Sequence, residues 1–410
     1  MKFDKFFIAQ EIKDNLEDNG YFRTTDIQYK AIPPILNGED VLAIAQTGTG
    51  KTAAFAVPVI HLIHSMKTSK RDRQVRCLIM VPTRELSQQI GEVVAKLSKH
   101  TKANSFAIYG GVEQDRQVMQ LKGGVDILIA TPGRMFDLIR QQHLDISGVS
   151  TLVLDEADRM LDLGFLDDIK AIKKMLTHRH QTLFFSATIN PQIKRLAYSL
   201  INSKAMRIQV SPENTVSKNI THSIIKVPME DKRHLLVNCL KELSDGKIIV
   251  FVRTQVRAQR VQSHLEKNDI PCTSIHGGME QFERDQSLKS FREGTVKILI
   301  ATDVTARGID LPGISHVINY DLPDLPENYV HRIGRTGRGF AKGDAISFVS
   351  PEEREKLLAI EELLQAKLIE QKVDKSLLVE HTKITEETSF ADYIAAEEDL
   401  YKPRRKKKKK

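Results

Sequence analysis

Short apolar segments rich in strand-forming residues alternate with longer amphipathic segments through most of the 410-residue chain. The pattern occurs early in the chain and then restarts, with apolar segments at residues 41–44, 77–81, 125–129 and 151–154 and again at 247–252, 296–300 and 316–319. Repeated strand-helix units produce a parallel sheet whose faces are covered by helices. We therefore predict an α/β fold with two tandem lobes, each a mostly parallel sheet flanked by helices.

The length and composition of the chain agree with two lobes and a tail. A chain of 410 residues with 41% hydrophobic residues exceeds the usual size of one domain and can fill two cores. A polar stretch at 211–219 predicts an interlobe linker at 210–220. The first lobe then covers 30–209, after a segment at 1–29, and the second lobe covers 221–366. An amphipathic helix over 351–366, packed on the second lobe, is predicted from the spacing of Leu357, Leu358, Ile360, Leu363 and Leu364.

The last part of the chain has an uneven charge distribution. Residues 402–410 carry eight basic side chains and no acidic one, whereas residues 351–401 carry 14 acidic and 6 basic ones. We expect 367–410 to form an acidic segment followed by a flexible basic tail, with 383–410 disordered because charged blocks bracket few apolar residues. Such a tail either binds a polyanion through counterion release or only keeps the protein soluble.

Cysteine usage and hydropathy favour an intracellular location. The three cysteines, Cys77, Cys239 and Cys272, are far apart and form no C-x-x-C pair, so they support neither a disulfide framework nor a zinc site. The first residues lack the apolar stretch of a signal peptide, and no run approaches the roughly 18 apolar residues of a membrane span. We expect a soluble, cytoplasmic protein that does not bind a membrane.

A glycine-rich loop follows the first predicted strand and precedes a helix-like segment. It consists of Ala45, Gln46, Thr47, Gly48, Thr49, Gly50, Lys51 and Thr52, where Ala45 replaces the usual first glycine of a phosphate loop. In such a loop, backbone amides and the helix N-terminus surround phosphate oxygens, Lys51 reaches the β and γ phosphates, and the Thr52 hydroxyl ligates Mg²⁺. An ordinary glycine-rich turn is the alternative, and the adjacent Lys51 and Thr52 disfavour it.

Two carboxylates follow the predicted strand at 151–154. Asp155, at the carboxyl end of the strand, can hold Mg²⁺, and Glu156 can polarise a water molecule that attacks the γ phosphate. Acidic residues are also favoured at helix N-termini, which would explain one carboxylate but not this placement. Together with Lys51, the pair predicts hydrolysis of a nucleoside triphosphate.

The sequence Asp155-Glu156-Ala157-Asp158 and the loop at 45–52 resemble the DEAD-box ATP-dependent RNA helicases of superfamily 2, and the resemblance covers residues 3–350. Further segments similar to motifs of that family occur in order at 82–86, 110–111, 131–134, 186–188, Phe251 with Thr254, Gln281 with Arg284, 301–303, 306–310 and 331–338. The resemblance implies two RecA-like lobes, ATP and Mg²⁺ as cofactors, and RNA as the partner. The short amino terminus and the modest basic extension are similar to those of bacterial RhlE-type members.

The resemblance also implies which residues outside the phosphate loop contact the nucleotide. Segment 1–29 would read adenine, and the implied contacts to the base and the ribose come from Phe3, Thr25, Gln28, Gly308 and Asp310. Phe3 would stack on the base, although Phe6 and Phe7 beside it could be core residues instead. Thr24 stands where the family usually has proline, so this loop is expected to be less stiff.

The resemblance implies RNA contacts from backbone amides and from small polar or basic side chains, which grip phosphates and sugars without reading sequence: Thr83, Arg84, Gly111, Thr131, Arg134, Gly277, Arg284 and Thr302. The residues implied to couple the carboxylates to lobe closure are Asp158, Ser186, Thr188 and His331. Arg335 and Arg338 would stabilise charge on the γ phosphate when the lobes close, and Arg332 has no assigned role. Taken singly, Arg84 and Arg134 could form surface salt bridges, Gly110 and Gly111 could form a plain turn, and His331 could be structural.

We therefore expect an RNA-stimulated ATPase that locally unwinds short RNA duplexes or remodels RNA–protein complexes as ATP and RNA close two lobes. Ribosome assembly or RNA turnover is the expected setting, with ribosomal RNA as substrate, proteins of those processes as partners, and a monomeric state. The alternative is an ATP-gated RNA clamp or chaperone with little unwinding, since the same motifs support clamping. An ATP-driven DNA motor is disfavoured, because the contact motifs match the RNA family.

Overall fold

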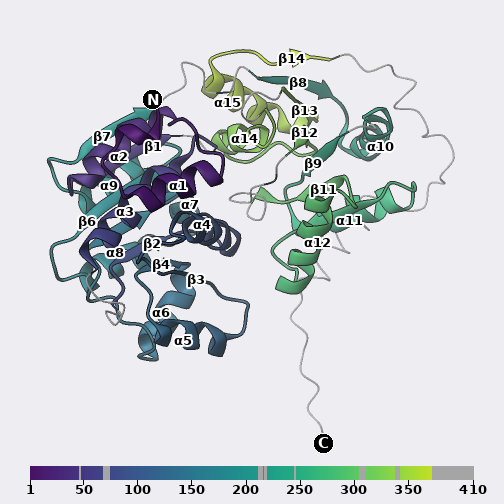
Figure 1. Ribbon diagram of the computed structural model, residues 1–410. Coiled ribbons are helices and arrows are strands. Elements are labelled where there is room, and N and C mark those ends of the chain that lie inside the picture. Colours follow the sequence, from purple (N-terminus) through teal and green to yellow (C-terminus); the bar gives the residue numbers. More distant parts are fainter. Residues whose placement is uncertain are drawn as a thin grey trace, which may run out of the picture.

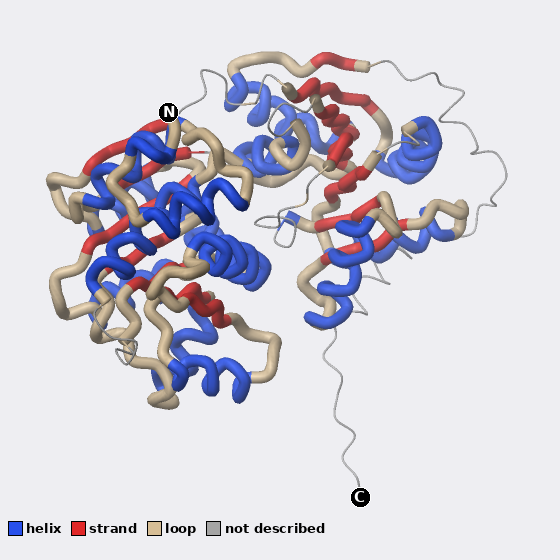
Figure 2. The backbone as a smooth tube through the Cα atoms, in the orientation of Figure 1, coloured by secondary structure: helices blue, strands red, loops and turns tan. Residues whose placement is uncertain are grey.

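The protein contains two parallel seven-stranded sheets, one in each half of the chain (Figure 1). The computed structural model describes residues 1–45, 48–67, 74–210, 216, 219–243, 246–303, 311, 313–337 and 342–371. Helices lie on both sides of the strands in each half (Figure 2). The predicted fold class, two tandem lobes with flanked parallel sheets, is confirmed.

The first lobe has the strand order β3-β4-β2-β5-β6-β1-β7. Its strands are β1 (Val41–Ala45), β2 (Cys77–Met80), β3 (Ser105–Ile108), β4 (Ile127–Ala130), β5 (Thr151–Leu154), β6 (Gln181–Ser186) and β7 (Met206–Val210). Its helices are η1 (Phe3–Lys5), α1 (Gln10–Asp18), α2 (Asp26–Leu36), α3 (Lys51–Met66), α4 (Arg84–Leu97), α5 (Gln114–Gly123), α6 (Pro132–Arg140), α7 (Ala157–Asp162), α8 (Leu166–Met175) and α9 (Pro191–Leu200).

The second lobe repeats the arrangement with the strand order β10-β11-β9-β12-β13-β8-β14. Its strands are β8 (Ile220–Lys226), β9 (Lys247–Phe251), β10 (Cys272–Ile275), β11 (Ile298–Ala301), β12 (Ile314–Asn319), β13 (Gly343–Val349) and β14 (Ile369–Glu370). Its helices are η2 (Met229–Asp231), α10 (Lys232–Glu242), α11 (Gln255–Glu266), α12 (Gln281–Glu293), α14 (Pro326–Ile333), η3 (Pro351–Glu353) and α15 (Arg354–Leu364).

Each sheet separates two hydrophobic cores. In the first lobe, helices α1 to α4 pack on one face of the sheet and α5 to α9 on the other. In the second lobe, α12, α14 and α15 pack on one face and α10 and α11 on the other. All residues of β1, β2, β4, β5 and β6 are buried, as expected for parallel strands covered on both sides.

The structure adds two details to the predicted organisation, whose boundaries stay a prediction. In the segment at 1–29, Phe3, Phe6 and Ile12 pack in the first-lobe core, and α2 spans residue 29. In the second lobe, β14 lies beyond residue 366 and pairs with β8. The predicted C-terminal helix is present as η3 and α15, and Leu357 and Ile360 are buried, but Leu358 is 55% exposed.

The loops that carry the candidate site follow the carboxyl ends of the strands. In the first lobe, Gly48, Thr83, Thr131 and Asp155 come after β1, β2, β4 and β5, respectively. In the second lobe, Gly277 and Thr302 come after β10 and β11. Carboxyl ends of parallel strands share one edge of a sheet, so this topology collects distant residues in one place.

Candidate functional site

The described part of the phosphate loop places a buried lysine at the start of α3. Gly48 and Gly50 both have positive φ angles, 83° and 90°, and Gly50 is the N-cap of α3. Lys51 is 6% exposed, and its Nζ has no hydrogen-bond partner among the described residues. A buried ammonium group that lacks a partner is costly, so this cradle suits an anion. Gln46 and Thr47 lie outside the described residues.

Two carboxylates face this lysine from the end of β5. Burial raises the pKa of Asp155 to about 6, although the Lys51 charge acts in the opposite direction. Burial also acts to raise the pKa of Glu156, but the charges of Arg159, Lys51 and Arg335 together lower it. Arg159 Nη1 donates to Glu156 Oε2 at 3.2 Å. Glu156 therefore stays ionised, and Asp155 is the carboxylate that would gain most from a bound cation.

Gln28 connects the N-terminal segment to the phosphate loop. Its Nε2 donates to the Gly50 carbonyl at 3.1 Å, and its Oε1 accepts from the Thr25 backbone N–H at 2.9 Å. Thr25 and Gln28 thereby form the capping box of α2. The amide group retains one further donor and one further acceptor position for a ligand. Thr24, at the position where proline was expected, donates its backbone N–H to the Met1 carbonyl, which proline cannot do.

Phe3 and Phe6 are both buried, whereas Phe7 is 91% exposed. The rings of Phe3 and Phe6 lie 6.3 Å apart, between centroids, in the first-lobe core. The structure thus places Phe3 among core residues, and the stacking role expected for it stays a prediction.

Asp158 joins the carboxylate segment to the loop after β6. Its Oδ2 accepts hydrogen bonds from the Ala187 N–H, the Thr188 N–H and the Thr188 hydroxyl, at 3.1, 3.0 and 3.1 Å. The Ser186 hydroxyl donates to the Thr188 carbonyl at 2.8 Å. Three of the four residues expected to couple closure therefore form one network in the first lobe.

The arginines of the second lobe occupy two different environments. Arg335 is 4% exposed, and its positive charge contributes to the lowered pKa of Glu156 in the first lobe. Arg332 is 1% exposed and forms two bonds to Asp303, from Nε at 2.5 Å and from Nη2 at 2.8 Å. His331 belongs to α14, and its backbone carbonyl accepts from Arg335 Nε. Arg338, Gly308 and Asp310 lie outside the described residues.

The expected RNA contacts from both lobes line one cavity of about 600 Å³. Seven of the eight residues line it, namely Thr83, Arg84, Gly111, Thr131, Arg134, Gly277 and Arg284, whereas Thr302 is buried after β11 and does not. Arg134 Nη1 and Arg284 Nε are buried and have no hydrogen-bond partner among the described residues. Two contacts cross between the lobes, from Arg84 Nη1 to Gln281 Oε1 at 3.2 Å and from Arg284 Nη1 to Glu85 Oε1 at 2.7 Å.

Comparisons with known proteins agree with this geometry. A DEAD/DEAH box helicase family model matches residues 25–196, and a helicase conserved C-terminal domain model matches residues 231–339. The chain is 40% identical over 402 residues to the ATP-dependent RNA helicase CshA of Listeria monocytogenes, covering 96% of this chain and 76% of that protein. The chain belongs to the DEAD-box ATP-dependent RNA helicases. As expected for this family, it is an ATPase and helicase.

Another relative of this DEAD-box chain is the DEAD-box ATP-dependent RNA helicase RhpA of Helicobacter pylori, 37% identical over 366 residues, covering 89% of the chain and 73% of that protein. The solved structure of Saccharomyces cerevisiae Dbp5 bound to RNA and ADP BeF3 is similar, with a TM-score of 0.79 and 30% sequence identity. The match covers 90% of this chain and 95% of that chain. The solved structure of the DEAD-box helicase Mss116 bound to ssRNA and UDP-BeF has a TM-score of 0.82 and 29% sequence identity, and the match covers 92% of this chain and 80% of that chain. The predicted pair of RecA-like lobes is confirmed, and the RhlE-type assignment stays a prediction.

Several side chains at the helicase site were not selected from the sequence. Glu85 bridges the lobes, Arg159 pairs with Glu156, and Leu163, Phe165 and Met279 line the cavity. Glu85 could have been found, because it lies within the motif at 82–86 and is the carboxylate nearest to Arg84 in sequence. The others carry no signal in a single sequence.

No described helix is long and apolar enough to cross a membrane.

Proposed function

We propose that Lys51, Asp155, Glu156 and Arg335, completed by Arg338, form the ATP-hydrolysing centre of this helicase. The observation that carries the proposal is the effect of Lys51 and Arg335, from different lobes, on the pKa of the same carboxylate, Glu156. Lys51 would hold phosphate oxygens, and Glu156 would accept a proton from the attacking water. Arg335 and Arg338 would stabilise the charge that develops on the γ phosphate.

Mg²⁺ fits the same centre. Thr52 and Asp155 would hold the ion, and the raised pKa of the buried Asp155 supports this assignment, because a nearby cation favours the ionised carboxylate. When bound, Mg²⁺ supplies charge neutralisation of the phosphates. Asp158, Ser186 and Thr188 would then transmit the state of the carboxylates to lobe closure, together with His331, and their hydrogen-bond network supports this role.

Adenine selection is assigned to the N-terminal segment. Gln28 and Thr25 would recognise the base edge, Phe3 would stack on it, and Gly308 and Asp310 would complete the nucleotide site. The position of Gln28 against Gly50 supports the first assignment, because a base bound beside the loop would lie within reach of the amide. The remaining loop residues, Ala45 and Gln46 to Thr49, would surround the phosphates through backbone amides.

RNA is proposed to bind along the cavity between the lobes, held mainly through phosphates and sugars by the seven expected residues that line it. Thr302, which does not line the cavity, stays a proposed contact. Two buried arginine nitrogen atoms, Arg134 Nη1 and Arg284 Nε, have no hydrogen-bond partner in the described part of the chain and support this proposal, as do the RNA-bound states of Dbp5 and Mss116. The test compares ATPase stimulation by RNA and DNA of one sequence. Stronger stimulation by DNA would contradict the proposal, because 2′-hydroxyl contacts distinguish the two polymers.

Closure of the two lobes on ATP and RNA would bend one strand of a short duplex and release the other. The protein would act as a monomer in the cytoplasm, in ribosome assembly or RNA turnover. Lobe 1 at 30–209, the linker at 210–220 and lobe 2 from 221 onward are the proposed units. A duplex-unwinding assay at matched RNA affinity separates this function from an ATP-gated clamp. Crosslinking to cellular RNA, with and without residues 402–410, tests ribosomal RNA as the substrate and the basic tail as its anchor.

A further inference from the structure

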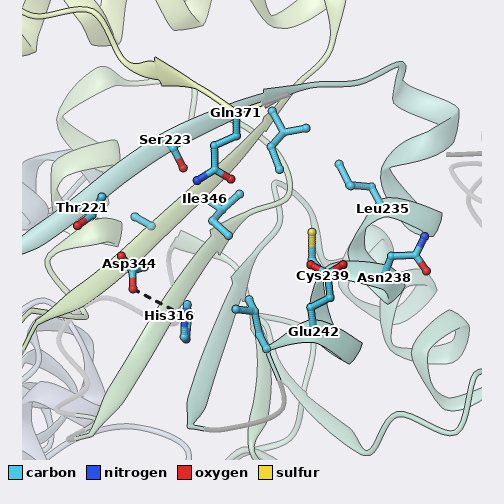
Figure 3. A pocket seen from close by; sticks show the side chains of 13 residues that line it. Thr221, Ser223, Leu235, Asn238, Cys239, Glu242, His316, Asp344, Ile346 and Gln371 are labelled. Carbon is cyan, nitrogen blue, oxygen red and sulfur yellow. Dashed lines mark ion pairs between the residues drawn. The ribbon is translucent and has the colours of Figure 1, made fainter. Parts of the chain in front are cut away.

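The second lobe contains a cavity of about 410 Å³ on the sheet face that α10 and α11 cover. These helices pack on side chains such as Ile225, Ile318 and Phe348 of strands β8, β12 and β13. Residues nearer the amino ends of the same strands, Thr221, His316 and Asp344, line the cavity together with Ile225 (Figure 3). The two helices therefore leave part of this sheet face uncovered.

The last described residue, Gln371, lies in the wall of this cavity (Figure 3). β14 runs parallel to β8 with Ile369 opposite Ser223, and the Gln371 N–H donates to the Ile224 carbonyl at 2.8 Å. An ion pair between Lys226 Nζ and Glu370 Oε2, at 2.6 Å, links the same strands. The side chain of Gln371 therefore lies on the sheet face that lines the cavity. The chain that follows Gln371 therefore starts at the cavity wall.

The lining has an apolar and an acidic part. The apolar side chains are Ile225, Leu235, Leu243 and Ile346, and the carboxylates are Glu242 and Asp344. Among the described lining residues there is no lysine or arginine, and His316 Nε2 lies 3.8 Å from Asp344 Oδ2. A matching occupant carries aliphatic side chains for the apolar part and positive charge for the rim.

We propose that residues 372–379 of the same chain, Lys-Val-Asp-Lys-Ser-Leu-Leu-Val, occupy this cavity. Val373, Leu377 and Leu378 supply the aliphatic groups, and Lys372 and Lys375 face the carboxylates. Leu377 lies six residue steps after Gln371, enough to span about 20 Å when extended. The segment thus closes the exposed face of the second lobe and anchors the start of the C-terminal region.

The rest of the C-terminal region matches the cavity less well. Residues 383–401 contain six acidic residues and one lysine, so the carboxylates of the rim would repel them. Residues 402–410 contain only lysine, arginine and one proline, and offer no aliphatic side chain for the apolar part. Among these segments, only 372–379 combines both properties at the correct distance from Gln371.

The absence of tryptophan from the chain provides the test. A Leu378→Trp variant of the full chain should show blue-shifted emission and a several-fold weaker quenching by acrylamide than the matched variant Tyr401→Trp. Adding Glu242→Lys and Asp344→Lys should expose the tryptophan of Leu378→Trp, and further addition of Lys372→Glu and Lys375→Glu should shield it again. RNA-stimulated ATPase activity, retained in every variant, serves as the check of folding.

Hydrogen exchange of the unaltered chain gives a second readout that no substitution can disturb. Amides of 372–379 should exchange more slowly than those of 390–401, to the same extent at all protein concentrations. Equal, fast exchange in both segments together with an exposed Leu378→Trp would overturn the proposal and leave the cavity open to another partner. Protection that grows with protein concentration would overturn it as well, because a second copy would then supply the segment.

Discussion

Glu156 is the residue on which hydrolysis depends most directly in the proposed mechanism. It is a non-glycine residue with φ of 51°, held by Arg159 at 3.2 Å and by the fold of the β5–α7 turn. Glu156→Gln keeps the shape of the side chain and removes its capacity to accept a proton. We expect RNA-saturated ATP hydrolysis to fall by about 10² to 10⁴-fold, the usual contribution of a general base. ATP and RNA should remain bound in a closed complex.

Single-turnover ATP hydrolysis and RNA retention on a filter check this expectation. Asp167→Asn is the matched control, because Asp167 is an exposed carboxylate of the same lobe that pairs with Lys170 on the surface. Its substitution should leave both measurements unchanged. Fast multiple turnover by Glu156→Gln would show that another group accepts the proton.

Arg332 shows why identical residues of one motif have different roles. It donates to both carboxylate oxygens of Asp303, and it also contacts Asn319 and the Asp321 carbonyl while lying over the Phe251 ring. Arg332→Met should lower the free energy of unfolding by about 3 kcal/mol. This value is near the lower end for a broken buried ion pair, because water reaches the Asp303 side chain, which is 23% exposed. Urea unfolding measures the change.

The surface pair of Arg140 with Asp137 gives the control for Arg332. Arg140→Met should change the free energy of unfolding by less than about 1 kcal/mol, because exposed ion pairs contribute little. Equal losses in the two variants would mean that Arg332 acts through bulk alone. The sequence assigned no role to Arg332, because its main partner is 29 residues away and is identified only by the fold.

At the scale of elements, the turn into α3 depends on the packing of α2 against the phosphate loop. A Cβ atom on Gly50 would overlap the Gln28 amide, and the φ of 90° is unfavourable for other residues. Gly50→Ala should therefore cost more than the roughly 1 to 3 kcal/mol of backbone strain alone and should weaken ATP binding. Gly164→Ala is the control, because Gly164 has φ of 84° with open space around its Cβ position.

Urea unfolding without nucleotide compares the two glycine variants. A free energy of unfolding that falls equally in both would show that Gln28 moves aside at no cost. A larger loss for Gly50→Ala would show that the capping box of α2 and the phosphate loop form one rigid element, as their hydrogen bonds indicate.

The segments predicted as strands all lie in the sheet interior, whereas the interior strands β6, β8 and β13 and the four edge strands were not among them. β5 begins and ends where the apolar segment at 151–154 does, because a strand covered on both faces reads as a continuous apolar run. β4 starts two residues later than the predicted segment, since Val125 and Asp126 precede the pairing with β2. β14 was missed, because its two residues, Ile369 and Glu370, are exposed and their strand conformation depends on β8.

At the scale of the whole molecule, the site exists only where the two lobes meet. The alternation of strands and helices predicted the two sheets that the structure contains, and the residues assigned to the site from the order of the motifs stay a prediction. The contacts between the lobes were not predictable, because Arg84 and Gln281 are 197 residues apart and Glu85 and Arg284 are 199 apart. Nothing in the composition of either segment indicates its partner.

The Glu85–Arg284 pair makes lobe closure testable. Its side chains are 6% and 13% exposed, so each single reversal, Glu85→Arg or Arg284→Glu, places like charges together with little water to screen them. Each should raise the RNA concentration for half-maximal ATPase activity by about tenfold or more, since 1.4 kcal/mol corresponds to a factor of ten. Dyes on the two lobes should report less closure by energy transfer.

The double reversal separates a bond between the lobes from a contact with RNA. If Arg284 pairs with Glu85 during closure, Glu85→Arg combined with Arg284→Glu restores opposite charges and should recover most of the closure lost in the single variants. If Arg284 acts only on RNA phosphates, the double variant should be no better than Arg284→Glu. Lys289→Glu, on the exposed face of α12, controls for loss of positive charge from that helix. Recovery confined to the double variant would establish that the same arginine holds the lobes together and lines the RNA cavity.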